Sequence, residues 1–141
     1  MTTGKKVFLG ITSAVFFGLL IFTGLLWYSL KNKPCIGLSS DEIQNFSLPE
    51  VSVFVSELNQ NPLKSLTPEE KQKLVSLLRG NLDGWSVSWH TPRAHKHSFH
   101  FQMGKTWLAG VGAGHNFLAK GDCQKDLSPE DQKILQSLIE Q

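Results

Sequence analysis

An uncharged run of 24 residues, Val7 to Leu30, constrains this chain more than any other feature. As an α-helix rising ~1.5 Å per residue it spans roughly 36 Å, more than the ~30 Å hydrocarbon core of a bilayer. It lacks the regularly spaced polar residues of an amphipathic helix that covers a soluble core. Trp27 and Tyr28 lie near one end, where amphipathic rings favour the headgroup level. The run predicts a single transmembrane helix over residues 7–30, after a short tail of residues 1–6.

The same run predicts a permanent anchor and one orientation. It is too long for a cleaved signal peptide and ends in bulky residues where a peptidase requires small ones, so we expect an uncleaved signal anchor. Lys5 and Lys6 precede it, and Lys31 and Lys33 follow it. Because the α-amino group adds to the first pair, we expect the N-terminus in the cytoplasm and residues 31–141 in the periplasm or outside the cell. The alternative is that the lysines merely cap both ends of the span.

Three small residues recur at intervals of four inside the run: Gly10, Ala14 and Gly18. They share one helix face, and small residues at this spacing let a second membrane helix approach closely. A chance occurrence of common small residues is the alternative.

Charge excludes one class of partner and cysteine spacing suggests one covalent link. From Pro34 onward the chain has ten Lys and Arg against twelve Asp and Glu, a net charge of −2, so it has no basic surface for nucleic acid. Cys35 and Cys123 are far apart in sequence. In an oxidising compartment they would form a disulfide; in a reducing cytosol they would be two free thiols.

Residues 31–40 contain Pro, Gly and Ser and predict a linker into a soluble α+β domain of residues 41–141. Thr67-Pro68 and Ser128-Pro129 each open an amphipathic helix. Residues 47–59 fit a helix with a capping box at Ser47, which we favour, or a strand that alternates through three valines. Residues 85–89, 99–103 and 107–111 alternate apolar and polar and predict about three antiparallel strands, packed by two or three helices. In the expected hairpin, Trp89 lies opposite Phe99.

Histidines are concentrated in one short segment, which holds His90, His95, His97 and His100. Imidazoles are ligands of zinc and copper, with Met103 a soft ligand for Cu(I), so a metal-binding domain is one hypothesis. The alternative is a solvated polar face without cofactor, which we favour, because two of the four residues fall in the predicted loop.

A binding role is the leading hypothesis for the soluble domain. The glycines of residues 110–114 are not followed by the helix of a nucleotide-binding fingerprint, and no other catalytic motif occurs, so we expect no catalysis. Exposed aromatic and arginine side chains anchor many protein interfaces. We therefore expect Arg93, His95 and Trp107 to bind another membrane or periplasmic protein, as in a subunit, an inhibitor or an immunity-type protein. A membrane-bound enzyme is the third hypothesis.

Overall fold

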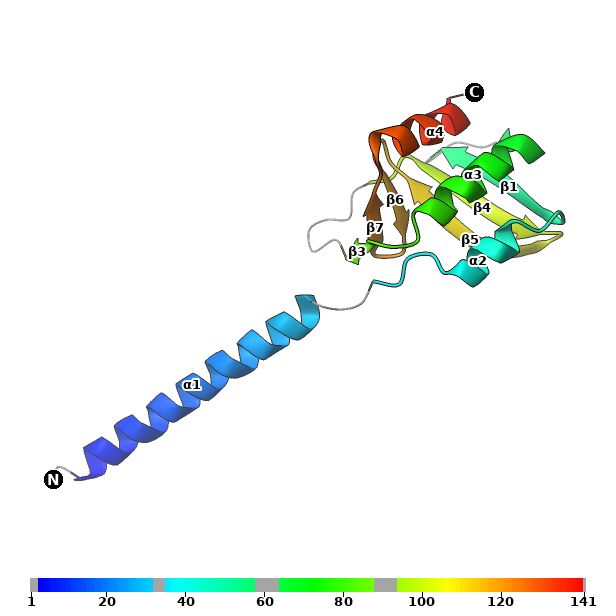
Figure 1. Ribbon diagram of the computed structural model, residues 1–141. Coiled ribbons are helices and arrows are strands. Elements are labelled where there is room, and N and C mark those ends of the chain that lie inside the picture. Colours follow the sequence, from blue (N-terminus) through cyan, green and yellow to red (C-terminus); the bar gives the residue numbers. More distant parts are fainter. Residues whose placement is uncertain (1–2, 32–34, 58–63, 88–93, 141) are drawn as a thin grey trace. The chain divides into compact units, whose positions relative to one another are not determined.

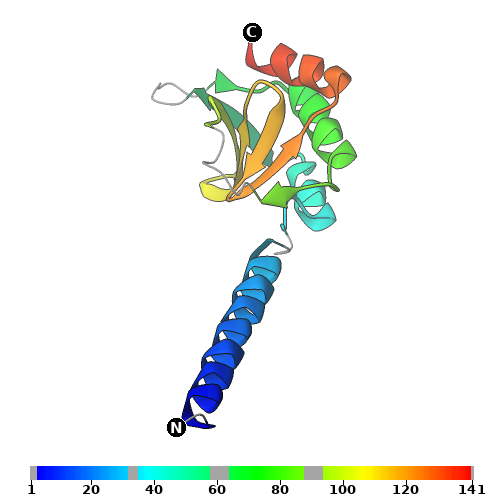
Figure 2. The ribbon, with the colours of Figure 1, turned by 90° about the vertical axis from the view of Figure 1, so that its left-hand side faces the viewer.

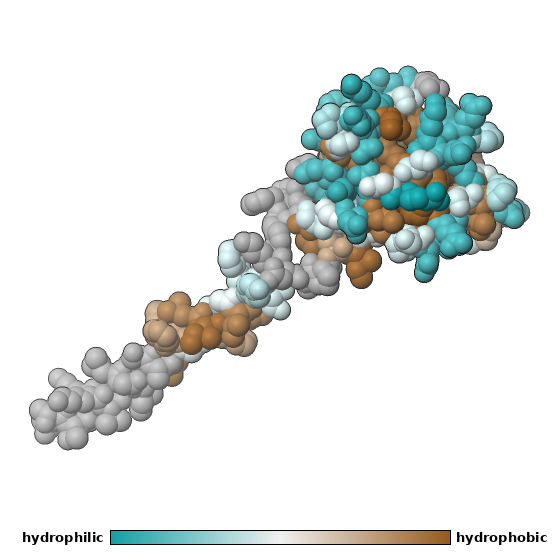
Figure 3. Space-filling view, viewed as in Figure 1, coloured by the Kyte–Doolittle hydropathy of each residue, from teal (hydrophilic) through white to brown (hydrophobic). Residues whose placement is uncertain are grey.

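The computed structural model describes residues 3–31, 35–57, 64–87 and 94–140. The chain divides into two compact units, Met1–Lys33 and Pro34–Gln141. The first unit holds the helix α1 (Thr3–Lys31). Side chains of α1 are described for residues 15–29, and this stretch is largely hydrophobic on its surface (Figure 3).

The predicted transmembrane helix is corrected by the structure. The helical conformation of residues 7–30 is present, but no helix in the described part of the chain is both long and apolar enough to cross a membrane. The single-pass anchor in a lipid bilayer is therefore not retained.

The second unit is built on an antiparallel sheet that has seven strands in the described residues, in the order β2-β1-β4-β5-β6-β7-β3 (Figure 1). The strands are β1 (Val51–Glu57), β2 (Lys64–Ser65), β3 (Ser86–Val87), β4 (His97–Met103), β5 (Thr106–Ala113), β6 (Phe117–Lys120) and β7 (Cys123–Asp126). The prediction of about three strands was wrong. The three predicted strands correspond to β3, β4 and β5. The missed strands are β1, for which a helix was favoured, and β2, β6 and β7, which have two or four residues each, too few to show a period of two.

Strand pairing also differs from the expected hairpin. Phe99 and Phe101 of β4 lie opposite Val55 and Val53 of β1, and β4 pairs with β5 on its other side. β3 pairs instead with β7, at the far edge of the sheet. Residues 51–57, favoured as part of a helix, form β1, because seven residue pairs with β4 outweigh the local capping signal at Ser47.

Three helices cover one face of this sheet: α2 (Ser40–Phe46), α3 (Pro68–Gly80) and α4 (Pro129–Ile139) (Figures 1 and 2). Ser39 and Thr67 cap α2 and α3 through complete capping boxes, and Ser128 caps α4. Each cap accepts a hydrogen bond from a backbone N–H that has no partner inside the helix. The starts of α3 and α4 agree with the sequence prediction.

The hydrophobic core lies between this helical layer and the sheet. Alternate strand residues supply it, among them Val53, Phe99, Phe101 and Val111, each no more than 1% exposed. Phe46 of α2 stacks on Phe101, with ring centroids 3.9 Å apart. We call the opposite side of the sheet the outer face.

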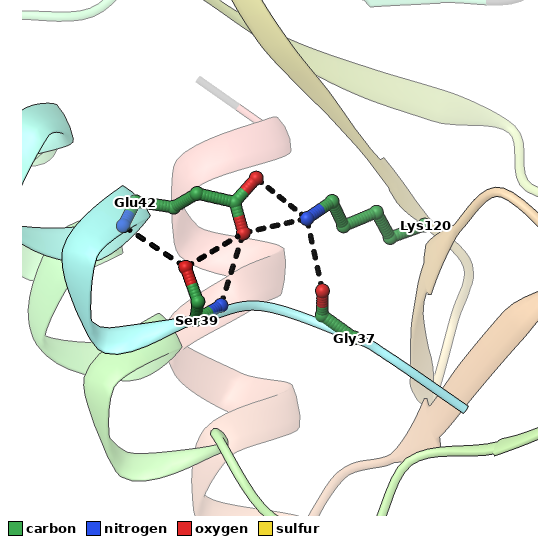
Figure 4. Close-up of polar contacts among 4 residues, drawn as sticks. All are labelled: Gly37, Ser39, Glu42 and Lys120. Atoms are coloured by element: carbon green, nitrogen blue, oxygen red, sulfur yellow. Dashed lines mark hydrogen bonds and ion pairs between the residues drawn. The ribbon is translucent and has the colours of Figure 1, made fainter. Parts of the chain in front are cut away.

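A short segment of residues 35–39, the strap, is linked to the sheet by a disulfide and by a half-buried lysine, Lys120. Cys35 and Cys123 are joined in the disulfide expected from the sequence. Lys120 donates to the carbonyl of Gly37 at 2.9 Å and to both carboxylate oxygens of Glu42 at 2.6 Å (Figure 4). Burial alone would raise the pKa of Glu42, but the hydrogen bonds from Lys120 and from the Ser39 backbone hold it below its ordinary value.

Candidate functional site

The outer face of the central strands carries an unusual row of side chains. Since Val53, Phe99 and Val111 point into the core, their neighbours along each strand point outward. Phe54 lies opposite His100, and His100 lies opposite Gly110. Phe54 and His100 are both half-buried. This face therefore presents aromatic and imidazole rings beside a strand that has glycine at alternate positions.

Three alternate glycines of β5 and its end each make room for a ring. A Cβ atom on Gly110 would lie 3.6 Å from the ring of Trp107, in ordinary van der Waals contact. On Gly112 it would lie 2.7 Å from the ring of His95, and on Gly114 it would lie 2.0 Å from the ring of Phe117. The rings of Trp107, His95 and Phe117 therefore occupy the space that larger side chains at these three positions would need.

Trp107 is the most prominent of these rings. A β-bulge in the β4–β5 pairing places Trp107 opposite Gln102, while Ala109 lies opposite Phe101. Trp107 is 60% exposed, and Met103, at the other end of the same tight turn, is 43% exposed. One side of the indole rests on Gly110 and the remainder is open to solvent. We call Phe54, His95, His100 and Trp107 the outer-face cluster.

His100 is held in place by a neighbouring strand. Its Nε2 lies 2.8 Å from the Oγ of Ser56, two residues beyond Phe54 on β1, and which atom donates depends on the tautomer. A serine beside a histidine is also the start of a hydrolytic triad, in which a third group orients the imidazole. Among the described residues, no carboxylate bonds to His100. The contact therefore fixes the ring on the outer face without completing a triad.

The structure separates the histidines predicted to bind metal. His95 and His100 lie on the outer face, whereas His97 alternates with His100 and points to the side of the sheet that carries the helices. Burial lowers the pKa of His97, while the charge of Glu57, opposite it on β1, raises it in part. His90 lies outside the described residues. Within the described part of the chain, no three His, Cys, Asp or Glu side chains are grouped as metal ligands.

The structure also brings together only some of the other predicted site residues. Arg93 lies outside the described residues, while His95 and Trp107 belong to one cluster. The side chains of Gly10 and Ala14 are not described, and a Cβ on Gly18 would have no neighbour within 4 Å among the described atoms. Helix packing through these residues remains a prediction.

Phe54 and Ser56 were missed from sequence because residues 47–59 were interpreted as a helix. Their signal was present in the alternation of Val51, Val53 and Val55 with small or aromatic residues. As a strand, that pattern places Phe54 and Ser56 together on the face opposite the valines.

No family model matches this chain, and no curated protein or solved structure matches it either.

Proposed function

We propose that the unit of residues 34–141 is a non-catalytic binding domain that recognises a partner protein through the outer-face cluster. The observation that carries this proposal is Trp107, a large ring that is 60% exposed and rests on a glycine strand. Solvent-exposed tryptophans are rare on surfaces that stay in water and are enriched among the residues that dominate binding energy at interfaces.

The neighbours of Trp107 fit a protein interface. Phe54 adds apolar area on the same face, and His100 and Gln102 add hydrogen-bonding groups there. The glycines of β5 let the rings of Trp107 and His95 lie close to the sheet. An aromatic anchor surrounded by neutral polar groups is the usual arrangement of an interface centre.

The proposed compartment is the periplasm or cell exterior. Its support is the disulfide between Cys35 and Cys123, since such bonds persist in oxidising compartments and are rare in the cytosol. A protein there that holds its partner without chemistry fits an accessory, inhibitory or immunity-type role.

Site-specific photo-crosslinking in the producing cells tests this function. A benzophenone amino acid at Gln102, which is paired with Trp107, should give one discrete protein adduct, and the same reagent at exposed Lys133 of α4 should not. Trp107→Ala should reduce the Gln102 adduct at least tenfold, because hot-spot truncations cost roughly 2 kcal/mol or more. An adduct that persists with Trp107→Ala, or none at Gln102, contradicts the proposal.

A metal-binding domain is the second candidate, and the placement of His95 and His100 on one face favours it. Imidazole pairs bind zinc or copper, with further ligands from solvent or other residues. After loading with Zn²⁺ or Cu²⁺ and desalting, the protein should retain metal, and a His95→Ala/His100→Ala variant should lose it. His97→Ala, on the opposite side of the sheet, is the matched control. Metal-free protein after loading rejects this candidate.

A further inference from the structure

A second surface feature lies on the helical side of the sheet, away from the outer-face cluster. It is a cleft of about 630 Å³ between α3 and the edge of the sheet formed by β1 and β2. Small-ligand pockets typically measure roughly 300–1,000 Å³. Val51 and Val53 of β1 and Val75 of α3 underlie it and are almost fully buried, while Pro49 and Pro68, which are exposed, supply the apolar surface of its wall. The cleft therefore has the size and the apolar lining of a ligand site.

The charges that line this cleft have one sign. Lys71 and Arg79 both line it, and no Asp or Glu is among its described lining residues. Lys71, Val75 and Arg79 recur at intervals of four, so they follow one side of α3 with the valine between the two cations. A ligand in the cleft would meet positive charge beside an apolar wall.

Lys71 already donates hydrogen bonds to backbone carbonyls. Its Nζ donates to the carbonyls of Leu48 at 2.5 Å and of Val51 at 2.6 Å, which uses two of its three N–H groups. Burial lowers the pKa of Lys71, while the charge of nearby Glu50, which does not line the cleft, raises it in part. Lys71 therefore links α3 to the start of β1 and has one N–H group left to donate to a ligand.

The guanidinium of Arg79 has no partner among the described residues. It is exposed in the last turn of α3, and in the part of the chain that the structure describes it has neither a hydrogen bond nor an ion pair. A guanidinium offers paired N–H groups that match the two oxygens of a carboxylate. One free guanidinium balances a monoanion; a dianionic phosphate would require a second free cation.

We propose that this cleft binds a small amphipathic monocarboxylate, whose carboxylate pairs with Arg79 and whose apolar body packs against the exposed rings of Pro49 and Pro68. Ser76, which lies between the two cations along α3 and also lines the cleft, adds a hydroxyl donor near the carboxylate. The site is independent of the proposed protein partner, because it uses no residue of the outer-face cluster.

The test is an NMR titration of the full-length chain with 3-phenylpropionate, in a sugar-free zwitterionic detergent because α1 exposes apolar side chains. The backbone amide signals of Val53 and Ser76 should shift in a saturable manner. Titration with 3-phenyl-1-propanol, which has the same apolar body without the charge, should require at least tenfold higher concentration, as expected for a lost charge-assisted pair.

Two matched variants separate the guanidinium from general charge. Arg79→Gln should weaken 3-phenylpropionate binding about tenfold or more. Arg79→Lys should bind with intermediate affinity, because it keeps the charge but loses the paired N–H groups of the guanidinium. Lys133→Gln removes an equal charge from α4 and should bind like the wild type. Unshifted Val53 and Ser76 signals, equal binding of the alcohol, or an unchanged affinity in a folded Arg79→Gln variant would each overturn the proposal.

Discussion

The contact between Gly114 and Phe117 predicts a large effect from one added methyl group. In Gly114→Ala the Cβ would lie 2.0, 2.5 and 2.5 Å from three carbons of the Phe117 ring, whereas carbon atoms in contact lie about 3.5–4.0 Å apart. Phe117 is 5% exposed, and the Gly114 amide donates to the Phe117 carbonyl at 2.9 Å, so the two backbones cannot separate without breaking a hydrogen bond. The ring has to leave its site.

The magnitude follows from that displacement. Exposing a buried phenylalanine costs about 1.5–3 kcal/mol, and replacing glycine by alanine restores about 0.4–1 kcal/mol by restricting the unfolded chain. The free energy of unfolding should therefore fall by about 0.5–2.6 kcal/mol. Gly80→Ala is the matched control: a Cβ there meets nothing within 4 Å, so this change at the end of α3 should stabilise the fold by about 0.4–1 kcal/mol.

Urea unfolding of the full-length chain, followed by the amide NMR signals of β5 and β6, measures both effects without a contribution from α1. In a Phe117→Ala background the steric cost is absent, so Gly114→Ala should stabilise by about 0.4–1 kcal/mol as Gly80→Ala does, which gives a coupling free energy of about 1.5–3 kcal/mol. A Gly114→Ala variant within about 0.5 kcal/mol of the wild type, or a double-mutant cycle without coupling, would refute the steric argument.

Three further perturbations test the strap and the start of β1. Replacing Cys35 and Cys123 by alanine opens a link between residues 88 apart and should lower the free energy of urea unfolding by about 3–5 kcal/mol in the chain-entropy model; an unchanged midpoint would contradict it. The folded-state pKa of Glu42 lies below its ordinary 4.5, so its carboxylate stabilises the fold above that pH and the stabilisation is lost as pH falls through the lowered pKa. In Glu42→Gln the free energy of unfolding should therefore fall less between pH 6 and pH 3 than it does in the wild type. An equal fall in both proteins would exclude the ion pair as its source. Lys71→Met leaves the Val51 carbonyl without its donor and should cost about 1–3 kcal/mol by urea unfolding, whereas Lys73→Met on the exposed side of α3 should be near neutral.

Local signals predicted the parts of the fold that local interactions decide. The capping box at Thr67 and the Ser128-Pro129 opening fix the starts of α3 and α4, and both can be identified within four residues of sequence. The capping pattern at Ser47 was equally clear and misleading. There the chain forms a strand, since pairing with β4, more than forty residues later, decides the conformation.

The alternation of apolar and polar residues predicted which side of a strand is buried, but it could not predict which strands pair with each other. Phe99 and Phe101 do face the core as expected, yet they pair with β1 and not with residues 85–89. Any odd-to-odd pairing buries the same side chains, so periodicity alone leaves the neighbour undetermined. The outer-face cluster could be predicted only in part for this reason: Trp107, His95 and His100 stand out by composition, whereas Phe54 and Ser56 join them only through the β1–β4 register.

The strap also sets an order of events in time. Cys35 is made first, and its partner Cys123 follows 88 residues later. At about 5–20 residues per second, ribosomal synthesis leaves Cys35 an unpaired thiol for roughly 4–18 s. Lys120, which holds Gly37 and Glu42, is made almost as late. The first segment of the domain to be synthesised is therefore among the last to be fixed in place, and during that interval its thiol is open to any other cysteine that it meets.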